Sequence, residues 1–147
     1  MKKFITISIC IVFFITLVSC NSNKVEPITE ELFNEICKEA GLNVSEAEIN
    51  NGQTSISALG VMGVYFHSFD NEQITESLYL SYIDDIPKSE LIETKKGSNY
   101  QITFASSSSV YNIFYKVDNV HIMISAGADE EEIEMANQII FSLRYKQ

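Results

Sequence analysis

The chain lacks tryptophan altogether and has few cysteine, histidine, proline and basic residues: Cys 3, His 2, Pro 2, and Lys and Arg together 10 among 147 residues. The two histidines, His67 and His121, stand singly on predicted strands, and no CxxC, HExxH or EF-hand pattern occurs. We therefore expect no metal site and no cofactor. No GxSxG motif surrounds a serine, and no glycine-rich loop precedes a predicted helix. We therefore predict that the chain is not an enzyme.

The small number of basic residues also limits which classes of partner the protein can bind. The 20 Asp and Glu outnumber Lys and Arg and give a formal net charge of −10. Nucleic acid is excluded as a partner, because such binding needs a basic surface that neutralises phosphates. Apolar letters make up 46% of the sequence and aromatic ones 11%, which excludes a disordered chain, and no repeat is found. We expect a single globular domain over residues 28–147.

A targeting segment occupies the start of the sequence. Lys2 and Lys3 precede an apolar run from Phe4 to Val18. A transmembrane helix needs roughly 20 apolar residues, so this shorter run is typical of the central part of a signal peptide.

The run ends in Leu17-Val18-Ser19-Cys20, which resembles the lipobox of bacterial lipoproteins. The resemblance implies that residues 1–19 are a signal peptide and that the mature chain begins at Cys20, whose thiol carries a diacylglycerol group. Two acyl chains are enough for stable anchoring, so the resemblance places the protein at the extracytoplasmic face of the cell membrane. Residues 20–27 would then be the lipidated Cys and a polar tether, which reaches at most about 25 Å. Two alternatives remain: a secretory signal cleaved elsewhere and an uncleaved anchor.

Cleavage would make the protein more acidic. Loss of Lys2 and Lys3 leaves eight basic residues against the 20 acidic ones, a net charge of −12. Such a charge attracts a basic protein or peptide of the cell envelope. Cys37 would be the one cysteine not removed or lipidated, which excludes an intrachain disulfide, and we expect it to be a buried apolar side chain.

Periodicity predicts helices at about residues 30–41, 70–86 and from 129 onward. The first has Thr29 as N-cap, Ile28 and Phe33 spaced for a hydrophobic staple, and Gly41 at its end. We predict that the second is capped by Asp70. The third is capped by Asp129, with Glu132 completing a capping box. The expected buried stripe of the second helix is Ile74, Leu78, Tyr82 and Ile86, and that of the third is Ile133, Ala136, Ile140 and Leu143.

Alternation predicts strands at about residues 61–69, 100–105, 110–117 and 120–126. Residues 43–60 remain unassigned, apart from a turn at 50–52 and a possible short strand at 55–59, and residues 88–98 are predicted to be a charged, mobile loop. Asp118-Asn119 would form the two-residue loop of a type I′ hairpin. That loop sets the register: Val117 with Val120, Tyr115 with Ile122, Ile113 with Ile124, Tyr111 with Ala126.

The expected fold is a two-layer α+β domain, with a mainly antiparallel sheet of three to four strands, one further short strand, and three helices packed on one face. The order of elements is similar to that of small uncharacterised lipoproteins of low-GC Gram-positive bacteria, a resemblance that implies no activity.

A possible binding face follows from the strand parity. The sheet side away from the predicted core carries aromatic, histidine and methionine side chains typical of contact surfaces: Tyr65, His67, Phe114, His121 and Met123. Alternatively, residues 43–60, residues 88–98 or a second copy of the chain cover that face. The main hypothesis is a protein or peptide interaction module of the inhibitor or immunity type. The alternative is a small-ligand binding accessory lipoprotein with a closed pocket.

Overall fold

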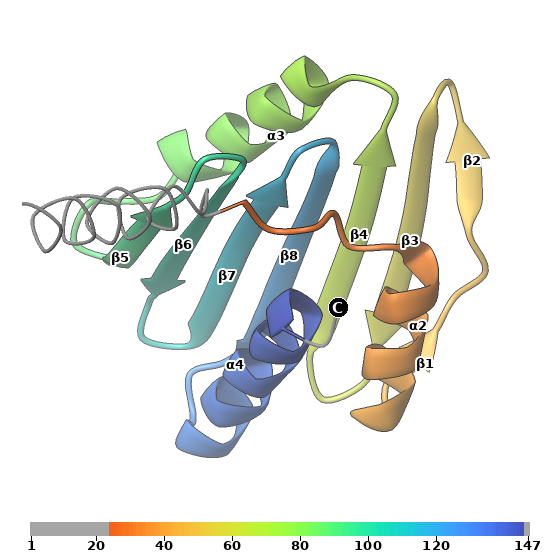
Figure 1. Cartoon of the computed structure of the whole chain (residues 1–147). Coiled ribbons are helices and arrows are strands. Elements are labelled where there is room, and N and C mark those ends of the chain that lie inside the picture. The colour runs from red at the N-terminus through yellow and green to blue at the C-terminus, as the bar shows by residue number, and fades with distance from the viewer. Residues whose placement is uncertain (1–23, 146–147) are drawn as a thin grey trace, which may run out of the picture.

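The structure is a computed structural model that describes residues 24–145 (Figure 1). The predicted signal peptide and Cys20 lie outside this range. The elements, in chain order, are α2 (Glu30–Glu39), β1 (Asn43–Val44), β2 (Glu48–Asn50), β3 (Gln53–Leu59), β4 (Gly63–Phe69), α3 (Glu72–Asp84), β5 (Leu91–Lys96), β6 (Tyr100–Ser106), β7 (Val110–Val117), β8 (Val120–Gly127) and α4 (Glu130–Tyr145). Over the described residues, no helix is both long and apolar enough to cross a bilayer.

The α+β class is confirmed, but the sheet is larger than the sequence predicted. Its strands run in the order β1-β3-β4-β8-β7-β6-β5, with β2 also paired to β3, and every pair is antiparallel. Residues 43–60, for which the sequence predicted only a turn at 50–52 and a possible short strand at 55–59, contain β1, β2 and β3. Asn51 and Gly52 link β2 to β3 with φ of 48° and 77°, the left-handed pair that a tight hairpin turn requires.

The predicted loop at residues 88–98 is wrong, because it contains β5. This strand is the last in the sheet, and most of its side chains are exposed. An edge strand with solvent on both sides needs no alternation of apolar and polar residues, so the sequence LIETKK carries no strand signal. Its charged residues are typical of edge strands that avoid pairing with another chain.

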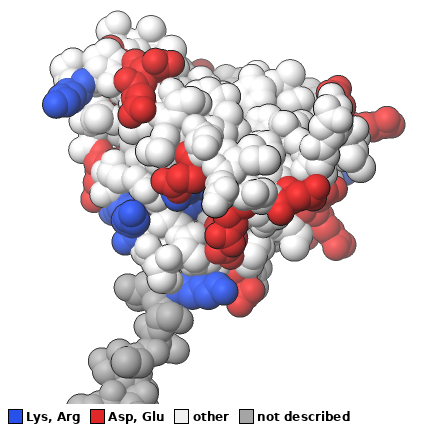
Figure 2. Space-filling view, turned by 90° about the horizontal axis from the view of Figure 1, so that it is seen from above, with Lys and Arg blue, Asp and Glu red and all other residues white. Residues whose placement is uncertain are grey.

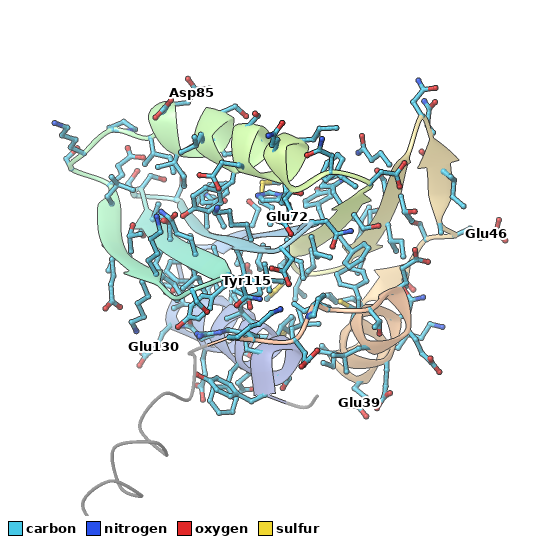
Figure 3. All side chains as sticks on the ribbon, turned by 45° about the horizontal axis from the view of Figure 1, so that its top comes forward. Glu39, Glu46, Glu72, Asp85, Tyr115 and Glu130 are labelled. Carbon is cyan, nitrogen blue, oxygen red and sulfur yellow. The ribbon has the colours of Figure 1, made fainter. Side chains whose placement is uncertain are left out.

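The prediction that all three helices pack on one face of the sheet is also wrong. The helices α2 and α4 cover one face and α3 lies on the other, so the domain has three layers (Figure 1). Figure 3 shows α3 above the sheet and α2 and α4 below it. The physical reason is that both faces of β6, β7 and β8 carry large side chains: Ile113 and Ile122 pack under α4, whereas Phe114 packs under α3.

Helix α2 follows its sequence signals. Thr29 is the N-cap, and its hydroxyl accepts a hydrogen bond from Leu32 N at 3.2 Å. At the other end, the N–H of Gly41 donates to Lys38 O and that of Leu42 to Cys37 O, with φ of 78° at Gly41. This is the Schellman arrangement that a glycine after a helix favours. Cys37 is fully buried, as expected.

Helix α3 differs from its prediction in both its cap and its buried side. Asn71, not Asp70, is the N-cap, and its side chain accepts from Gln73 N at 2.7 Å. Asp70 N instead donates to Gly52 O, which ties Asp70 to the β2–β3 turn. The fully buried residues are Thr75 and Tyr79, and Ile74 of the predicted stripe is 50% exposed.

The β7–β8 hairpin has the predicted register, from Val117 opposite Val120 to Tyr111 opposite Ala126. Among the described non-glycine residues, only Asn51 and Asp118 have positive φ, so Asn119 does not complete a type I′ turn. Helix α4 then starts as predicted. Glu132 N donates to Asp129 Oδ1 at 3.1 Å, while the Glu132 carboxylate accepts from Gly127 N at 2.6 Å rather than from the cap residue itself.

Candidate functional site

Strand register aligns a row of polar side chains across the α3 side of the sheet. Each member lies directly opposite the next on the neighbouring strand. From β2 to β5 the row is Glu48, Ser55, His67, His121, Lys116, Gln101 and Lys96. A second row beside it contains Ser57, Tyr65, Met123, Phe114 and Thr103. The sheet face away from the main core is thus polar at its centre.

All five residues of the predicted binding face lie in these two rows, but α3 divides them. Phe114 and His121 are buried beneath the helix. Tyr65, His67 and Met123 are half-buried, on β4 and β8. We call the partly exposed portion the open sheet face and define it by Ser55, Ser57, Tyr65, His67 and Met123. From the sequence we expected that a loop or a second copy of the chain could cover this face. In the structure a helix of the same chain covers part of it.

His121 is held by stacked rings and not by hydrogen bonds. The Tyr82 ring lies 5.5 Å from its ring, nearly parallel at 9°, and the His67 ring lies 6.2 Å away at 21°. Neither ring nitrogen of His121 has a hydrogen-bond partner within the described chain. Burial, with a smaller contribution from the neighbouring His67, lowers the pKa of His121 to about 3. The imidazole is therefore neutral at physiological pH.

His67 has a polar neighbourhood that the sequence reading missed. Its Nδ1 lies 3.1 Å from Ser55 Oγ and 3.2 Å from Gln53 Nε2, and Gln53 also donates to Ser55 Oγ at 2.8 Å. Burial lowers the pKa of His67. A serine beside a histidine is the geometry of an activated nucleophile, but the hydrogen-bond partners of this imidazole are an amide and a hydroxyl, with no carboxylate to orient it.

Gln53 and Ser55 were missed as site residues because the possible short strand at 55–59 was not paired with any other strand. The signal that would have found them is the turn at Asn50-Asn51-Gly52. It predicts a hairpin in which residues 53, 55 and 57 share one face.

Helix α3 sits on this face through polar contacts. The hydroxyl of Tyr79 is hydrogen-bonded to Thr103 Oγ1, which also bonds Thr94 Oγ1 at 2.9 Å. Lys116 forms an ion pair with Glu76 and places its ammonium group 5.7 Å from the centre of the Tyr79 ring. Burial lowers the pKa of Lys116, and the Glu72 carboxylate opposes that shift. The helix thus rests on a mixed surface and not on a purely apolar one.

Acidic side chains border the open sheet face. Glu48 lies directly beside Ser55 in the polar row, and Glu46, Asp70 and Glu72 are exposed nearby on the chain that leads into β2 and into α3. Figure 3 labels Glu46 beyond the outer edge of the sheet and Glu72 at the start of α3. In the view of Figure 2, red side chains extend over the middle and right of the surface. The rim of this site is therefore negative.

Two hollows lie away from the open sheet face. One, of about 690 Å³, runs along the outer side of α4. A polar hollow of about 320 Å³ lies between the start of α3 and the β5–β6 turn. Within residues 24–145, no group of three or more His, Cys, Asp or Glu side chains is placed to hold a metal ion.

Comparisons with known proteins give a fold and no family. No family model and no curated protein matches the sequence. The fold is similar to the crystal structure of a GTP-binding regulator from Thermotoga maritima, with a TM-score of 0.50 and 8% sequence identity, over 79% of this chain and 87% of that chain. At this identity the likeness concerns the arrangement of helices and strands alone.

Proposed function

We propose that the protein is a lipoprotein, anchored through Cys20 at the extracytoplasmic face of the cell membrane, whose folded domain binds a basic protein or peptide at the open sheet face. The observation that carries the binding part is charge. Residues 20–147 have a net charge of −12, and carboxylates border the open sheet face. Charge complementarity of this kind steers a cationic partner and selects against acidic ones.

The side chains of the open sheet face suit such a partner. The Tyr65 ring can receive a guanidinium or ammonium group on its face, and the Glu48 carboxylate, two strands away beside Ser55, offers an ion pair. His67, being neutral, adds no repulsion. Met123, opposite Tyr65 on β8, supplies a polarizable apolar contact. An inhibitor or immunity protein directed at a basic cell-wall hydrolase or bacteriocin is the narrowest form of this proposal.

A small-ligand binding accessory is the alternative. The observation that favours it is the polar hollow of about 320 Å³, whose lining includes Lys96, Lys116 and Tyr100. A ligand held there would protect those residues and leave Glu48 and Tyr65 unaffected, which distinguishes the two functions.

The anchor is tested on the full chain expressed in a bacterium. We expect membrane recovery and a mass that corresponds to cleavage before Cys20 plus a diacylglyceryl group. A Cys20→Ala variant should keep residues 1–19 and lose the lipid. An unmodified Cys20 in the wild-type protein would contradict this part of the proposal.

Binding is tested by capture of envelope proteins on the purified, detergent-solubilised lipoprotein, followed by elution in a salt gradient. We expect a basic protein that is released at moderate salt, and we expect Glu48→Lys to weaken its binding about tenfold, or about 1.4 kcal/mol. Glu35→Lys is the matched control, because it makes the same charge change on the exposed side of α2, beyond the opposite face. Equal losses in both variants, or retention that does not respond to salt, would contradict the proposal.

A further inference from the structure

The point where the chain enters the domain is fixed to one turn of the sheet. Val25 N donates to Asn99 Oδ1 at 2.9 Å, and Asn99 Nδ2 donates back to Val25 O at 2.7 Å. Asn99 also donates to Asp118 Oδ2 at 3.0 Å, and Val25 packs against the main core. Within the predicted tether of residues 20–27, Val25 is therefore held at the β5–β6 turn.

This attachment limits how far the domain stands from a lipid on Cys20. Val25 is five positions after Cys20, and even a fully extended chain spans only about 18 Å over five steps. The β5–β6 turn and the surface around it therefore lie next to whatever holds Cys20.

Basic side chains gather around the same turn, although the protein as a whole is acidic. Four of the seven Lys and Arg residues in the described range lie here: Lys24, Lys95, Lys96 and Arg144. Lys96 and Asn99 line one hollow together with Tyr100. The Arg144 guanidinium lies 4.8 Å from the Tyr100 ring centre, and Arg144 shares a second hollow with Lys95. In the view of Figure 2 most of the blue side chains lie on the left.

Exposed aromatic rings adjoin these cations. Phe141 is 63% exposed and Tyr145 is 60% exposed, and their ring centres are 4.6 Å apart. Both line the hollow that contains Lys95 and Arg144. Aromatic rings beside basic side chains are the combination that proteins place at the headgroup level of a bilayer. Glu93 pairs with Lys95 at 3.0 Å, and Glu72, Glu76 and Asp118 line the hollow that contains Lys96.

We propose that this surface, defined by Lys24, Lys95, Lys96, Phe141, Arg144 and Tyr145, lies against the anionic headgroups of the bilayer that holds Cys20. The inference rests on the lipid anchor of the proposed function. Anionic lipids attract a local group of Lys and Arg and repel the acidic remainder of the domain. The strand order places β5 and β6 at one end of the sheet and β2, β3 and β4 at the other. The open sheet face is thereby turned away from the membrane, where a soluble partner reaches it.

The absence of tryptophan from the chain provides a clean test. The lipidated full chain is reconstituted in vesicles of phosphatidylcholine with 30% phosphatidylglycerol, part of whose acyl chains are brominated to quench tryptophan on contact. A Tyr145→Trp variant reports on the proposed surface. An Ile49→Trp variant is the matched control, because Ile49 is 80% exposed on β2 at the far end of the sheet. Phe141→Trp is a second probe of the surface, in case Tyr145→Trp disturbs the fold.

We expect quenching of Tyr145→Trp to be at least twice that of Ile49→Trp, and Lys95→Gln with Lys96→Gln to reduce it. Replacing phosphatidylglycerol with phosphatidylcholine should also reduce it. Equal quenching at the two positions, or quenching at Tyr145→Trp that is the same in both vesicles, would overturn the orientation while leaving the anchor intact. Flotation with the vesicles is scored separately, since a chain that does not float contradicts the anchor, and the orientation with it.

Discussion

The two faces of the sheet are built differently. Under α2 and α4 the contacts are apolar and continuous: Phe33 packs on Phe66 with ring centres 5.3 Å apart, and Ile122 and Leu143 are fully buried. Under α3 the buried apolar residues of the cluster are only Tyr79, Ala105 and Phe114. Around them lie partly buried hydrophobic side chains such as Tyr82, Ile83 and Met123, together with the polar row.

This difference indicates that one face of the sheet mainly stabilises the fold and that the other is suited to binding. Burial of apolar area is the main source of folding free energy, so the α2 and α4 face supplies most of it. The α3 face carries unpartnered polar atoms at His121 and Thr75, which cost free energy when buried. Such atoms also occur on the other side, at Asn34, Tyr115 and Arg144, but there a much larger apolar core offsets their cost. We infer that α3 is the less firmly held helix and that the face beside it is the one available for binding.

The largest expected effect comes from truncating the apolar face. Phe66→Ala should lower the free energy of unfolding by about 3–5 kcal/mol, because it leaves a cavity in a close-packed core. Urea unfolding measures it. Phe114→Ala, the matched change on the α3 face, should cost clearly less, since its cavity lies beside a polar, partly open seam. Equal losses in the two variants would remove the distinction between the faces.

Acid should destabilise the protein through the α3 face. The pKa of His121 is lowered to about 3 in the folded state from an ordinary 6.5. Between these two pH values the imidazole is protonated in the unfolded chain and neutral in the folded one. Stability is therefore full above pH 6.5 and falls as the pH drops toward 3. Between pH 7.5 and 5 we expect a loss of about 2 kcal/mol. The measurement is urea unfolding at several pH values.

The groups that face His121 are His67 on β4, Tyr79 and Tyr82 on α3, and Lys116 beside it on β7, which is paired with Glu76. Burial lowers the pKa of His67 as well, so it adds to the loss in the same direction. A pH slope that His121→Leu leaves unchanged would contradict this assignment.

Replacing His121 itself should stabilise the protein at pH 7.5. His121→Leu removes two buried nitrogens that lack partners and fills a similar volume, for a gain of about 1 kcal/mol. His67→Leu is the contrasting variant, because it breaks the hydrogen bonds with Ser55 and Gln53. A destabilised His121→Leu would show that the imidazole makes a contact that stabilises the fold.

The smallest expected effect is at the caps. Thr29→Ala and Asn71→Ala each remove one side-chain acceptor at a helix start and should cost about 1 kcal/mol. For Thr29 the cost should appear in global unfolding, because α2 belongs to the main core. For Asn71→Ala we expect part of the lost stability to appear as faster hydrogen exchange of the backbone amides within α3 alone. Global effects of equal size would show that α3 unfolds together with the core.

The sequence predicted the structure best where one side of a helix or strand is buried and the other is exposed to solvent. The two-residue loop at Asp118-Asn119 and the alternation around it were enough to predict the register of the β7–β8 hairpin from Val117–Val120 to Tyr111–Ala126. The capping residues predicted where α2 and α4 begin. The sequence was least informative at β5, whose edge position removes alternation. It also misjudged α3, which turns Thr75 and Tyr79 toward the sheet. The hydroxyl of Tyr79 bonds Thr103 there, a contact with no local signal in the sequence.

The candidate site shows the same limit. Parity alone placed Tyr65, His67, Phe114, His121 and Met123 on one face of the sheet. Which of them stay accessible depends on where α3 docks. That is a tertiary property with no local signal, because the contacts of Tyr79 and Tyr82 reach strands far away in the sequence.

The most direct test of the difference between the faces is native-state hydrogen exchange on the full chain at pH 7.5. We expect the backbone amides of α3 from Thr75 to Asp84 to exchange through openings that leave α4 intact, so that their protection is lower than that of Ala136 to Leu143. Equal protection in the two helices, lost together at the free energy of global unfolding, would contradict the account.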